Sequence, residues 1–167
     1  MSNCYSLHFV KNEHDINQFW QLRDKYMHED ILPNATFDPA TEEDYEWFFS
    51  PKYKENIMKA FYRKKHTLHI VFLQDSNENI GFAVYVIYHG EDGKCLIVDF
   101  CIIAEYRNKG IGAQFFQMLR KHVMTEYAVY FALNLSNENN KRFWERNGFV
   151  KAYKDEFAND VYEKRPL

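Results

Sequence analysis

The stretch LIVDFCIIAEYRNKGIG, residues 96–112, decides how this chain folds. Its first half belongs to an almost unbroken apolar run over residues 94–103, which is typical of a strand in the centre of a sheet. Its second half is polar and carries two glycines. A helical pattern begins directly after it, with apolar side chains every three or four positions: Ile111, Phe115, Met118, Leu119 and Val123. The stretch therefore predicts a buried strand that turns sharply into an amphipathic helix.

The turn between that strand and that helix has the composition of an anion site. The first backbone N–H groups of a helix lack partners within it, and the positive end of the helix dipole lies there too. Gly110 and Gly112 let a phosphate approach the main chain, while Arg107 and Lys109 add positive charge. No Gly-Lys-Ser/Thr follows, as a Walker loop requires, and Phe115 replaces the third glycine of a dinucleotide fingerprint. An ordinary tight connection is the alternative for the turn taken alone.

The flanking sequence predicts one mixed α/β domain over residues 1–167. Period-two alternation at residues 5–9 predicts a strand, and a helix capped by Asn12 follows, which we expect Pro33 to stop. A second helical region opens at Asp38 and is broken at Ser50. Strands are predicted at residues 66–73, 79–89 and 128–135, a short helix at 139–146, and two final strands around 158–160. The resulting sheet has about seven strands, is mixed but mostly antiparallel, and is flanked by about four helices.

Composition narrows the class of protein. The 167 residues are 46% hydrophobic and 18% aromatic, which excludes a disordered chain. A net charge of −3 gives no reason to expect nucleic-acid or membrane binding. Cys4, Cys95 and Cys101 lack metal-ligand spacing, so we expect free thiols and no metal. With neither a signal peptide nor a membrane-spanning run, we expect a cytoplasmic protein.

Residues 102–112 resemble the acetyl-CoA loop of the GNAT superfamily of N-acetyltransferases. That family's pattern is Gln/Arg-x-x-Gly-x-Gly/Ala after an apolar strand, and here it is Arg107-x-x-Gly110-x-Gly112. A second element, NENNKRFWERNGF at residues 137–149, is similar to the family's Asn…Tyr…Gly-Phe helix. The order of strands and helices also fits. The resemblance implies an acetyl-CoA-dependent N-acetyltransferase whose sheet splays at the acetyl-CoA site.

The resemblance also implies roles for single residues. The main chain of Cys101 and Ile102 would pair with pantetheine, and a main-chain N–H near Ile102 would stabilise the reacting carbonyl oxygen. Asn137 would hydrogen-bond the pantetheine arm, and Trp144 would lie near the sulfur. The pyrophosphate would be held by the N–H groups of Arg107, Asn108, Lys109, Gly110, Ile111 and Gly112.

Two positions leave the chemistry open. Residue 144 is Trp where most of the family has Tyr, and an indole N–H cannot protonate a leaving thiolate as a phenol can. Trp144 therefore has either a packing role or a place at the sulfur. Asp99 is the only charge in residues 96–103, so it is the candidate general base, with a structural carboxylate as the alternative. Seven acids between Glu29 and Glu46, with no Lys or Arg, would either attract a cationic amine or form a solvated face.

We therefore expect transfer of an acetyl group from acetyl-CoA to a primary amine, by direct attack in a ternary complex. The acceptor is a small molecule or a protein amine, and the protein is a monomer or homodimer. The first alternative is a non-catalytic acyl-CoA-binding module with the same fold. The second is an interaction domain that has lost the ligand, against which the intact loop at residues 107–112 argues.

Overall fold

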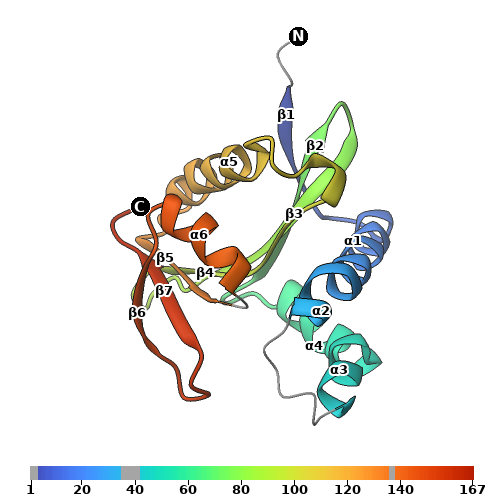
Figure 1. Cartoon of the computed structure of the whole chain (residues 1–167), viewed down its shortest axis with the longest axis horizontal. Coiled ribbons are helices and arrows are strands. Elements are labelled where there is room, and N and C mark those ends of the chain that lie inside the picture. The colour runs from blue at the N-terminus through green and yellow to red at the C-terminus, as the bar shows by residue number, and fades with distance from the viewer. Residues whose placement is uncertain (1–3, 35–41, 136–137) are drawn as a thin grey trace.

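The computed structural model describes residues 4–34, 42–135 and 138–167 (Figure 1). The strands are β1 (Tyr5–Phe9), β2 (Leu68–Asp75), β3 (Glu78–Ile87), β4 (Lys94–Ile102), β5 (Tyr130–Asn134), β6 (Val150–Lys154) and β7 (Asp160–Lys164). The helices are α1 (Glu13–Tyr26), the π-helical η1 (Met27–Ile31), α2 (Leu32–Asn34), α3 (Glu42–Phe49), α4 (Pro51–Tyr62), the 3-10 turn η2 (Ala104–Tyr106), α5 (Ile111–Thr125) and α6 (Glu138–Arg146).

The strands form one seven-stranded sheet in the order β1-β2-β3-β4-β5-β7-β6. β4 and β5 are parallel and are joined by α5, and the other neighbours in this sheet are antiparallel. The predicted mixed, mostly antiparallel sheet is thereby confirmed. The two-residue turn between β2 and β3 has positive φ at Ser76 and Asn77, as a tight hairpin turn requires.

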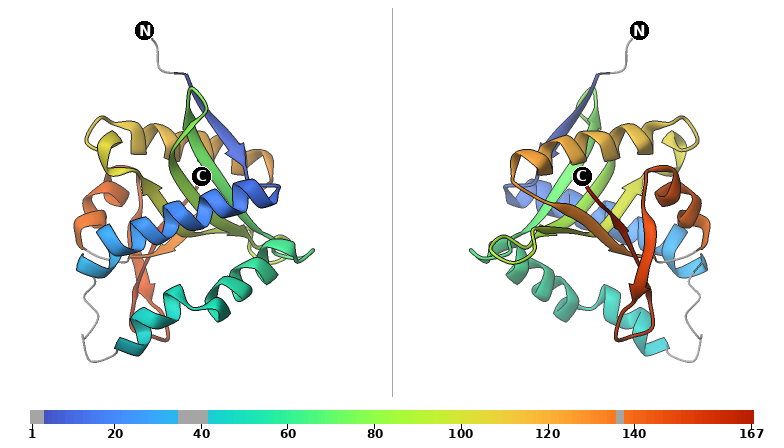
Figure 2. Two further views of the ribbon diagram at one scale, coloured as in Figure 1. Left: turned by 90° about the vertical axis from the view of Figure 1, so that its right-hand side faces the viewer. Right: turned by 90° about the vertical axis from the view of Figure 1, so that its left-hand side faces the viewer.

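Helices cover both faces of the sheet. α5 and α6 lie over one face, and α1 with α2 to α4 lies on the other side (Figures 1 and 2). Under α5, a large core contains Phe115, Phe116 and Leu119, each fully buried. Under α1, a second core contains Phe19 and Phe82. Because β4 has one core on each side, its nearly unbroken apolar sequence is explained.

The helix starts follow the sequence signals. Asn12 caps α1 by accepting a hydrogen bond at its side-chain Oδ1 from the N–H of Asp15, at 2.9 Å. Ser50 caps α4 in the same way, and Pro51 stands at its first position. β2 begins at Leu68, later than predicted, because His66 has a left-handed φ of 50°. Each of these starts is set by a local backbone requirement.

Pro33 does not stop the first helix where the sequence predicted. α1 continues into η1 and then into α2, which includes Pro33. In η1 the N–H of Leu32 donates to the carbonyl of Met27, five residues back, so the hydrogen-bond pattern has already shifted before Pro33. Proline has no N–H to contribute to that pattern. The start predicted at Asp38 for the second helical region lies outside the described residues.

Within the described residues, no helix has both the length and the apolar character needed to cross a bilayer.

Candidate functional site

The sheet opens where β4 and β5 separate. Their parallel pairing runs from Lys94 and Tyr130 to Ile97 and Leu133, whereas β4 continues to Ile102. The last part of β4 therefore pairs with β3 alone, and β5 does not pair with its other edge. The family resemblance implied a splay after Ile102, and the structure has it, but the pairing with β5 already ends at Ile97.

A β-bulge in β4 decides which side chains face which helix. The register between β3 and β4 shifts by one residue, which leaves Val98 without a partner on β3. Ile97 packs in the core under α5, whereas Cys101, four residues on, packs in the core under α1. In a regular strand both side chains would lie on the same face. Asp99 lies after the bulge and shares the α1 side with Cys101.

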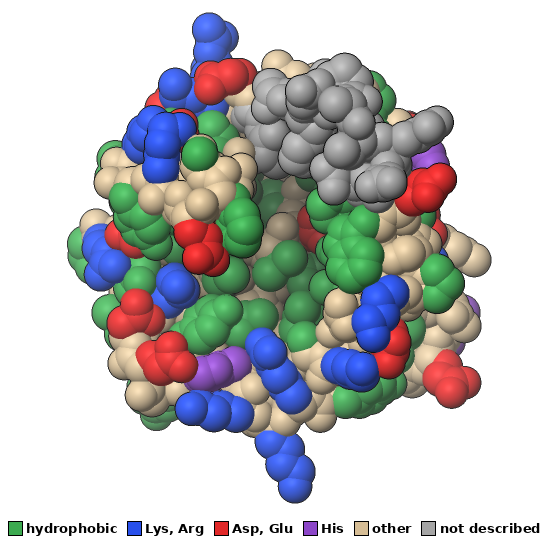
Figure 3. Space-filling model, turned by 90° about the horizontal axis from the view of Figure 1, so that it is seen from below, with side chains coloured by type: hydrophobic (Ala, Val, Ile, Leu, Met, Phe, Trp, Pro, Cys, Tyr) green, Lys and Arg blue, Asp and Glu red, His purple; other side chains and the backbone are tan. Residues whose placement is uncertain are grey.

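A cavity of about 650 Å³ lies between the end of β4, the loop before α5, and α6. Seen from below, the molecule is hollowed and hydrophobic side chains line the hollow (Figure 3). Lys109 and Ile111 do not line this cavity, and Asn137 lies outside the described residues. The other predicted cofactor-site residues do line it: Cys101, Ile102, Arg107, Asn108, Gly110, Gly112 and Trp144.

The backbone at the end of β4 gives Cys101 and Ile102 different surroundings. The N–H of Ile103 donates to the carbonyl of Ile80 on β3, at 2.9 Å. Because hydrogen bonding alternates along an antiparallel strand, the main chain of Cys101 is also directed to β3, where it is paired with Phe82. The N–H of Ile102 is directed into the gap.

The loop before α5 leaves space for an anion. Gly110 has φ of 76° and is the N-cap of α5, and a Cβ built on it would meet nothing within 4 Å. The unpaired N–H groups of the first turn of α5 begin at this open point. Gly112 is needed for another reason, because a Cβ there would lie 3.1 Å from the ring of Phe143 on α6. One glycine opens the loop and the other lets the two helices approach.

Arg107 is not a free cation at this loop, contrary to the sequence interpretation. Its two terminal nitrogens donate to the two carboxylate oxygens of Asp30, each at 2.6 Å, and its Nε donates to the carbonyl of Ile102 at 2.7 Å. The hydrogen bonds to Asp30 raise the pKa of Arg107. Arg107 therefore fastens the loop to η1, which also lines this cavity.

Positive charge in the cavity comes instead from α6. Arg142 and Arg146 line it, one turn apart on the same face of the helix. The structure gives neither side chain an ion pair with another described residue. Lys109 is directed elsewhere, since its Nζ donates to the carbonyl of Glu105 at 2.9 Å. The sequence interpretation missed both arginines because they lie outside the glycine loop.

Trp144 belongs to an aromatic cluster. Its side chain is almost buried, at 6% exposure, and its ring lies 5.2 Å from Phe100, 4.9 Å from Phe143 and 5.0 Å from Phe149. These edge-to-face contacts are typical of core packing. Trp144 nevertheless lines the large cavity and a second one beside it.

The second cavity, of about 240 Å³, holds Asp99. The Asp99 side chain is 19% exposed, and burial raises its pKa to about 6, with the cation of Arg23 acting in the opposite direction. Its Oδ2 lies 3.9 Å from the Nε of Arg23. The two cavities share Tyr26, Ile31, Phe100, Asn140 and Trp144, so they meet beside Asp99.

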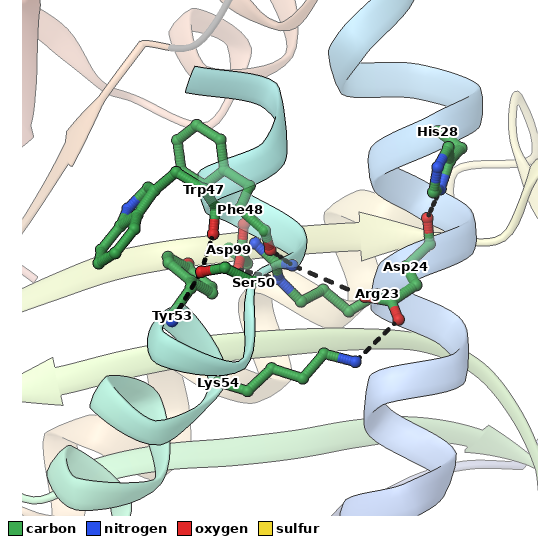
Figure 4. A network of polar contacts seen from close by, with 9 residues as sticks. All are labelled: Arg23, Asp24, His28, Trp47, Phe48, Ser50, Tyr53, Lys54 and Asp99. Atoms are coloured by element: carbon green, nitrogen blue, oxygen red, sulfur yellow. Dashed lines mark hydrogen bonds and ion pairs between the residues drawn. The ribbon is translucent and has the colours of Figure 1, made fainter. Parts of the chain in front are cut away.

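Arg23 contacts side chains and main chain from several elements that line the second cavity (Figure 4). It is only 2% exposed, donates to the carbonyl of Phe48 at 2.9 Å, and lies with its guanidinium 4.5 Å from the ring centroid of Tyr53. Three elements, α1, α3 and α4, thus meet at one cation. Arg23 and Tyr26 both stand in the apolar stripe of α1, and that unusual placement of polar groups was the one signal available in the sequence.

Burial raises the pKa of Tyr26 well above its ordinary value, with the Asp99 carboxylate adding to the effect. The phenol therefore stays protonated at neutral pH and can donate a hydrogen bond where the two cavities meet. No group of three or more His, Cys, Asp or Glu side chains within the described ranges is arranged to hold a metal ion.

Several solved structures share this fold along nearly their whole length. An acetyltransferase from Thermus thermophilus superposes with a TM-score of 0.69 at 14% identity, covering 98% of this chain and 97% of that one. The PaiA N-acetyltransferase of Thermoplasma acidophilum, in complex with coenzyme A, gives 0.67 at 18% identity and covers 95% and 98%. A GNAT family acetyltransferase from Elizabethkingia anophelis, with acetyl-CoA bound, gives 0.59 at 12% identity and covers 100% of both chains.

At these identities the structures establish the fold alone. No curated protein sequence matches the chain significantly. The sequence model described as "Acetyltransferase (GNAT) family" matches residues 27–149, which include η1, the bulged strand, the glycine loop and α6. That match covers well over half of the 167 residues. The chain therefore belongs to the GNAT family of acetyltransferases.

Proposed function

We propose that this protein transfers the acetyl group of acetyl-CoA to a primary amine, by direct attack while both substrates are bound. The observation that carries the proposal is the pair of adjoining cavities. The larger one extends from the open N-terminus of α5 to the gap beside β4, and the smaller one holds a single carboxylate, Asp99. A long cofactor and a small acceptor would meet at their junction.

The cofactor side supports binding of a phosphate-bearing, extended molecule. The N–H groups of residues 107–112 would hold the pyrophosphate, since Gly110 leaves the start of α5 open. The N–H of Ile102, which is directed into the gap, would bind the pantetheine arm or the reacting carbonyl oxygen. Cys101 would contribute its side chain rather than its main chain, and Asn137 remains a predicted partner of the arm. Arg142 and Arg146 would add charge for the phosphates.

The chemistry needs a proton acceptor for the amine. Asp99, with its pKa of about 6, is mostly ionised at neutral pH and is still basic enough to accept a proton directly or through water. A main-chain donor at the gap would stabilise charge on the carbonyl oxygen, and one such donor contributes about 3 kcal/mol. The leaving thiolate would take its proton from solvent, because Trp144 cannot supply one.

Direct attack is favoured over a covalent enzyme intermediate. The cysteine beside the gap is Cys101, and burial raises its pKa to about 12. Its thiol therefore stays protonated near neutral pH and is a poor nucleophile.

A non-catalytic acyl-CoA-binding module is the second candidate, favoured by the burial of Trp144 among aromatic rings where an acid would otherwise stand. A panel of primary amines incubated with acetyl-CoA and the protein, and analysed by mass spectrometry, separates the two functions. Any amine recovered with an added acetyl group supports transfer and eliminates a role in binding alone. Binding of acetyl-CoA with no product from any amine would support the module instead.

A further inference from the structure

The lining of the smaller cavity points to a particular kind of acceptor. Among the described residues that line it, Asp99 and Arg23 carry the charges. Most of the others are aromatic or aliphatic, among them Phe48, Tyr53 and Leu133. At about 240 Å³ the cavity is smaller than the pockets of about 300–1,000 Å³ that hold drug-sized ligands. It suits a compact molecule with an apolar surface.

Arg23 is already engaged and does not offer an anion site. One of its terminal nitrogens donates to the carbonyl of Phe48, its guanidinium lies over Tyr53, and its Nε faces Asp99. Only 2% of its surface is exposed. A carboxylate on the acceptor would therefore need to displace a buried contact, which disfavours amino acids as acceptors.

Asp99 and Arg23 together limit how much positive charge the smaller cavity accepts. Asp99 attracts one amine, but Arg23 at 3.9 Å offsets the field of that carboxylate. A second ammonium group would meet apolar walls and the guanidinium, and burying an unpaired charge there is costly. Arg23 is shared with Asp24 at 3.8 Å, and Asp24 also pairs with Lys54 at 3.1 Å, so the two cations and two carboxylates balance. This near-neutral group favours the uncharged form of a bound amine, which is the form that attacks a carbonyl.

We infer that the acceptor is a compact primary monoamine with an apolar, preferably aromatic, body, as in an arylalkylamine. This inference rests on the proposed function and names its substrate class. The aromatic rings of Phe48 and Tyr53, whose centroids lie 5.5 Å apart, would pack against the body. Asp99 would face the amine at the junction with the larger cavity.

The test compares kcat/KM for four acceptors with the whole protein at saturating acetyl-CoA, by release of the CoA thiol. The acceptors are 2-phenylethylamine, n-butylamine, spermidine and a short peptide with a free N-terminus. We expect 2-phenylethylamine to exceed spermidine and the peptide by about tenfold or more. Equal or better turnover of spermidine or the peptide overturns the inference and leaves the proposed function standing. If acetyl-CoA raises the melting temperature but no amine reacts, the proposed function fails and takes the inference with it.

A variant pair tests the apolar wall directly. Phe48→Ala keeps the carbonyl that binds Arg23 but removes the ring, and should raise KM for 2-phenylethylamine by about tenfold without changing KM for acetyl-CoA. Phe48→Leu serves if the alanine variant is unstable, and should give a smaller rise. Trp47→Ala is the matched control, since this neighbouring aromatic is 42% exposed and lines neither cavity. Unchanged KM values in both Phe48 variants would contradict the proposed acceptor wall.

Discussion

The two sides of the site are built in different ways. The cofactor side combines the main chain of one continuous segment, the end of β4, the glycine loop and the start of α5, with side chains of α6. The acceptor side consists of side chains from seven elements, α1, η1, α3, α4, β4, β5 and α6. The contacts proposed for the first are mostly main-chain N–H groups, which every residue except proline has. The second depends on which side chain stands at each position.

This difference has a consequence for substrate use. A main-chain cradle tolerates many substitutions as long as the glycine and the helix start remain, so its ligand is held constant. A cavity walled by side chains changes its ligand whenever one wall residue changes. Mutations on the cofactor side should therefore weaken binding of acetyl-CoA and spare the acceptor, and mutations on the acceptor side should do the reverse.

The largest effect is expected from Gly110→Asp. A carboxylate at the open start of α5 would occupy the anion position and repel phosphate, so the thermal stabilisation by acetyl-CoA should disappear. At a hundredfold excess over the dissociation constant, the unchanged protein should gain about 5–10 °C in melting temperature. The shift is measured by scanning fluorimetry with and without acetyl-CoA.

Gly110→Ala is the matched control for backbone strain. Its φ of 76° disfavours any Cβ, by about 1–2 kcal/mol, so both variants should melt lower than the unchanged protein in the absence of ligand. The alanine variant should keep most of its response to acetyl-CoA, since nothing lies within 4 Å of the added methyl group. A folded Gly110→Asp variant with a full response would show that the pyrophosphate binds elsewhere.

Asp99→Asn should have the opposite selectivity, because it should impair the acceptor side and spare the cofactor side. Without a proton acceptor, kcat should fall by about a hundredfold. Affinity for acetyl-CoA should stay the same, because the proposed cofactor contacts do not involve this carboxylate. In the unchanged protein kcat should fall as pH falls through about 6, where Asp99 becomes protonated, and the variant should lose this limb.

The melting temperature of Asp99→Asn distinguishes catalysis from structure. Because the folded protein raises the pKa of Asp99 from 3.8 to about 6, it binds this proton more tightly than the unfolded chain does. The stability that this group contributes is therefore present at low pH and is lost as pH rises through about 6. At pH 7 the variant should melt no lower than the unchanged protein. A clear drop, together with unchanged kcat, would make Asp99 a structural carboxylate paired with Arg23.

The smallest kinetic effect is expected from Trp144→Phe. If the indole only packs against the neighbouring rings, kcat should stay within a few-fold of the unchanged protein, measured at saturating substrates. Trp144→Tyr is the companion variant, because it restores the residue that most of the family has at this position. A gain with Tyr would show that protonation of the thiolate by solvent limits the rate. A hundredfold loss with Phe would place position 144 in the chemistry.

The fold and the strand, turn and helix around the glycine loop could be predicted because they depend on local patterns. The apolar run of β4, the glycines and the stripe of α5 are contiguous, and each has a direct structural meaning. The partner of Arg107 could not be predicted in this way, because Asp30 lies 77 residues away. In the sequence, Arg107 is only an arginine beside a glycine loop. In the structure, its hydrogen bonds to Asp30 link that loop to η1, which lines both cavities.

The acceptor side resisted prediction for a related reason. An arginine in the apolar stripe of a helix has no single interpretation until its partners are known, and the partners of Arg23 outside its own helix come from α3, α4 and β4. The π-helical turn in η1 also leaves no mark in the spacing of apolar residues, so the sequence predicts a helix end at Pro33 that the structure does not have. The sequence patterns do not report long-range partners or local changes in helix type, so neither feature could be predicted.

The bulge at Val98 means that β4 has one more residue than its pairing with β3 requires. Deleting that residue would make Ile97 and Asp99 successive positions of a regular strand, still opposite Tyr85 and Val84, so both side chains would keep their present sides. Deleting Phe100 instead would make Asp99 and Cys101 adjacent, and adjacent side chains of a strand point to opposite faces. Loss of codon 98 from the gene should therefore leave the Asp99 carboxylate beside Arg23. Loss of codon 100 should instead place Asp99 and Cys101, which now share the α1 side, on opposite faces of the sheet.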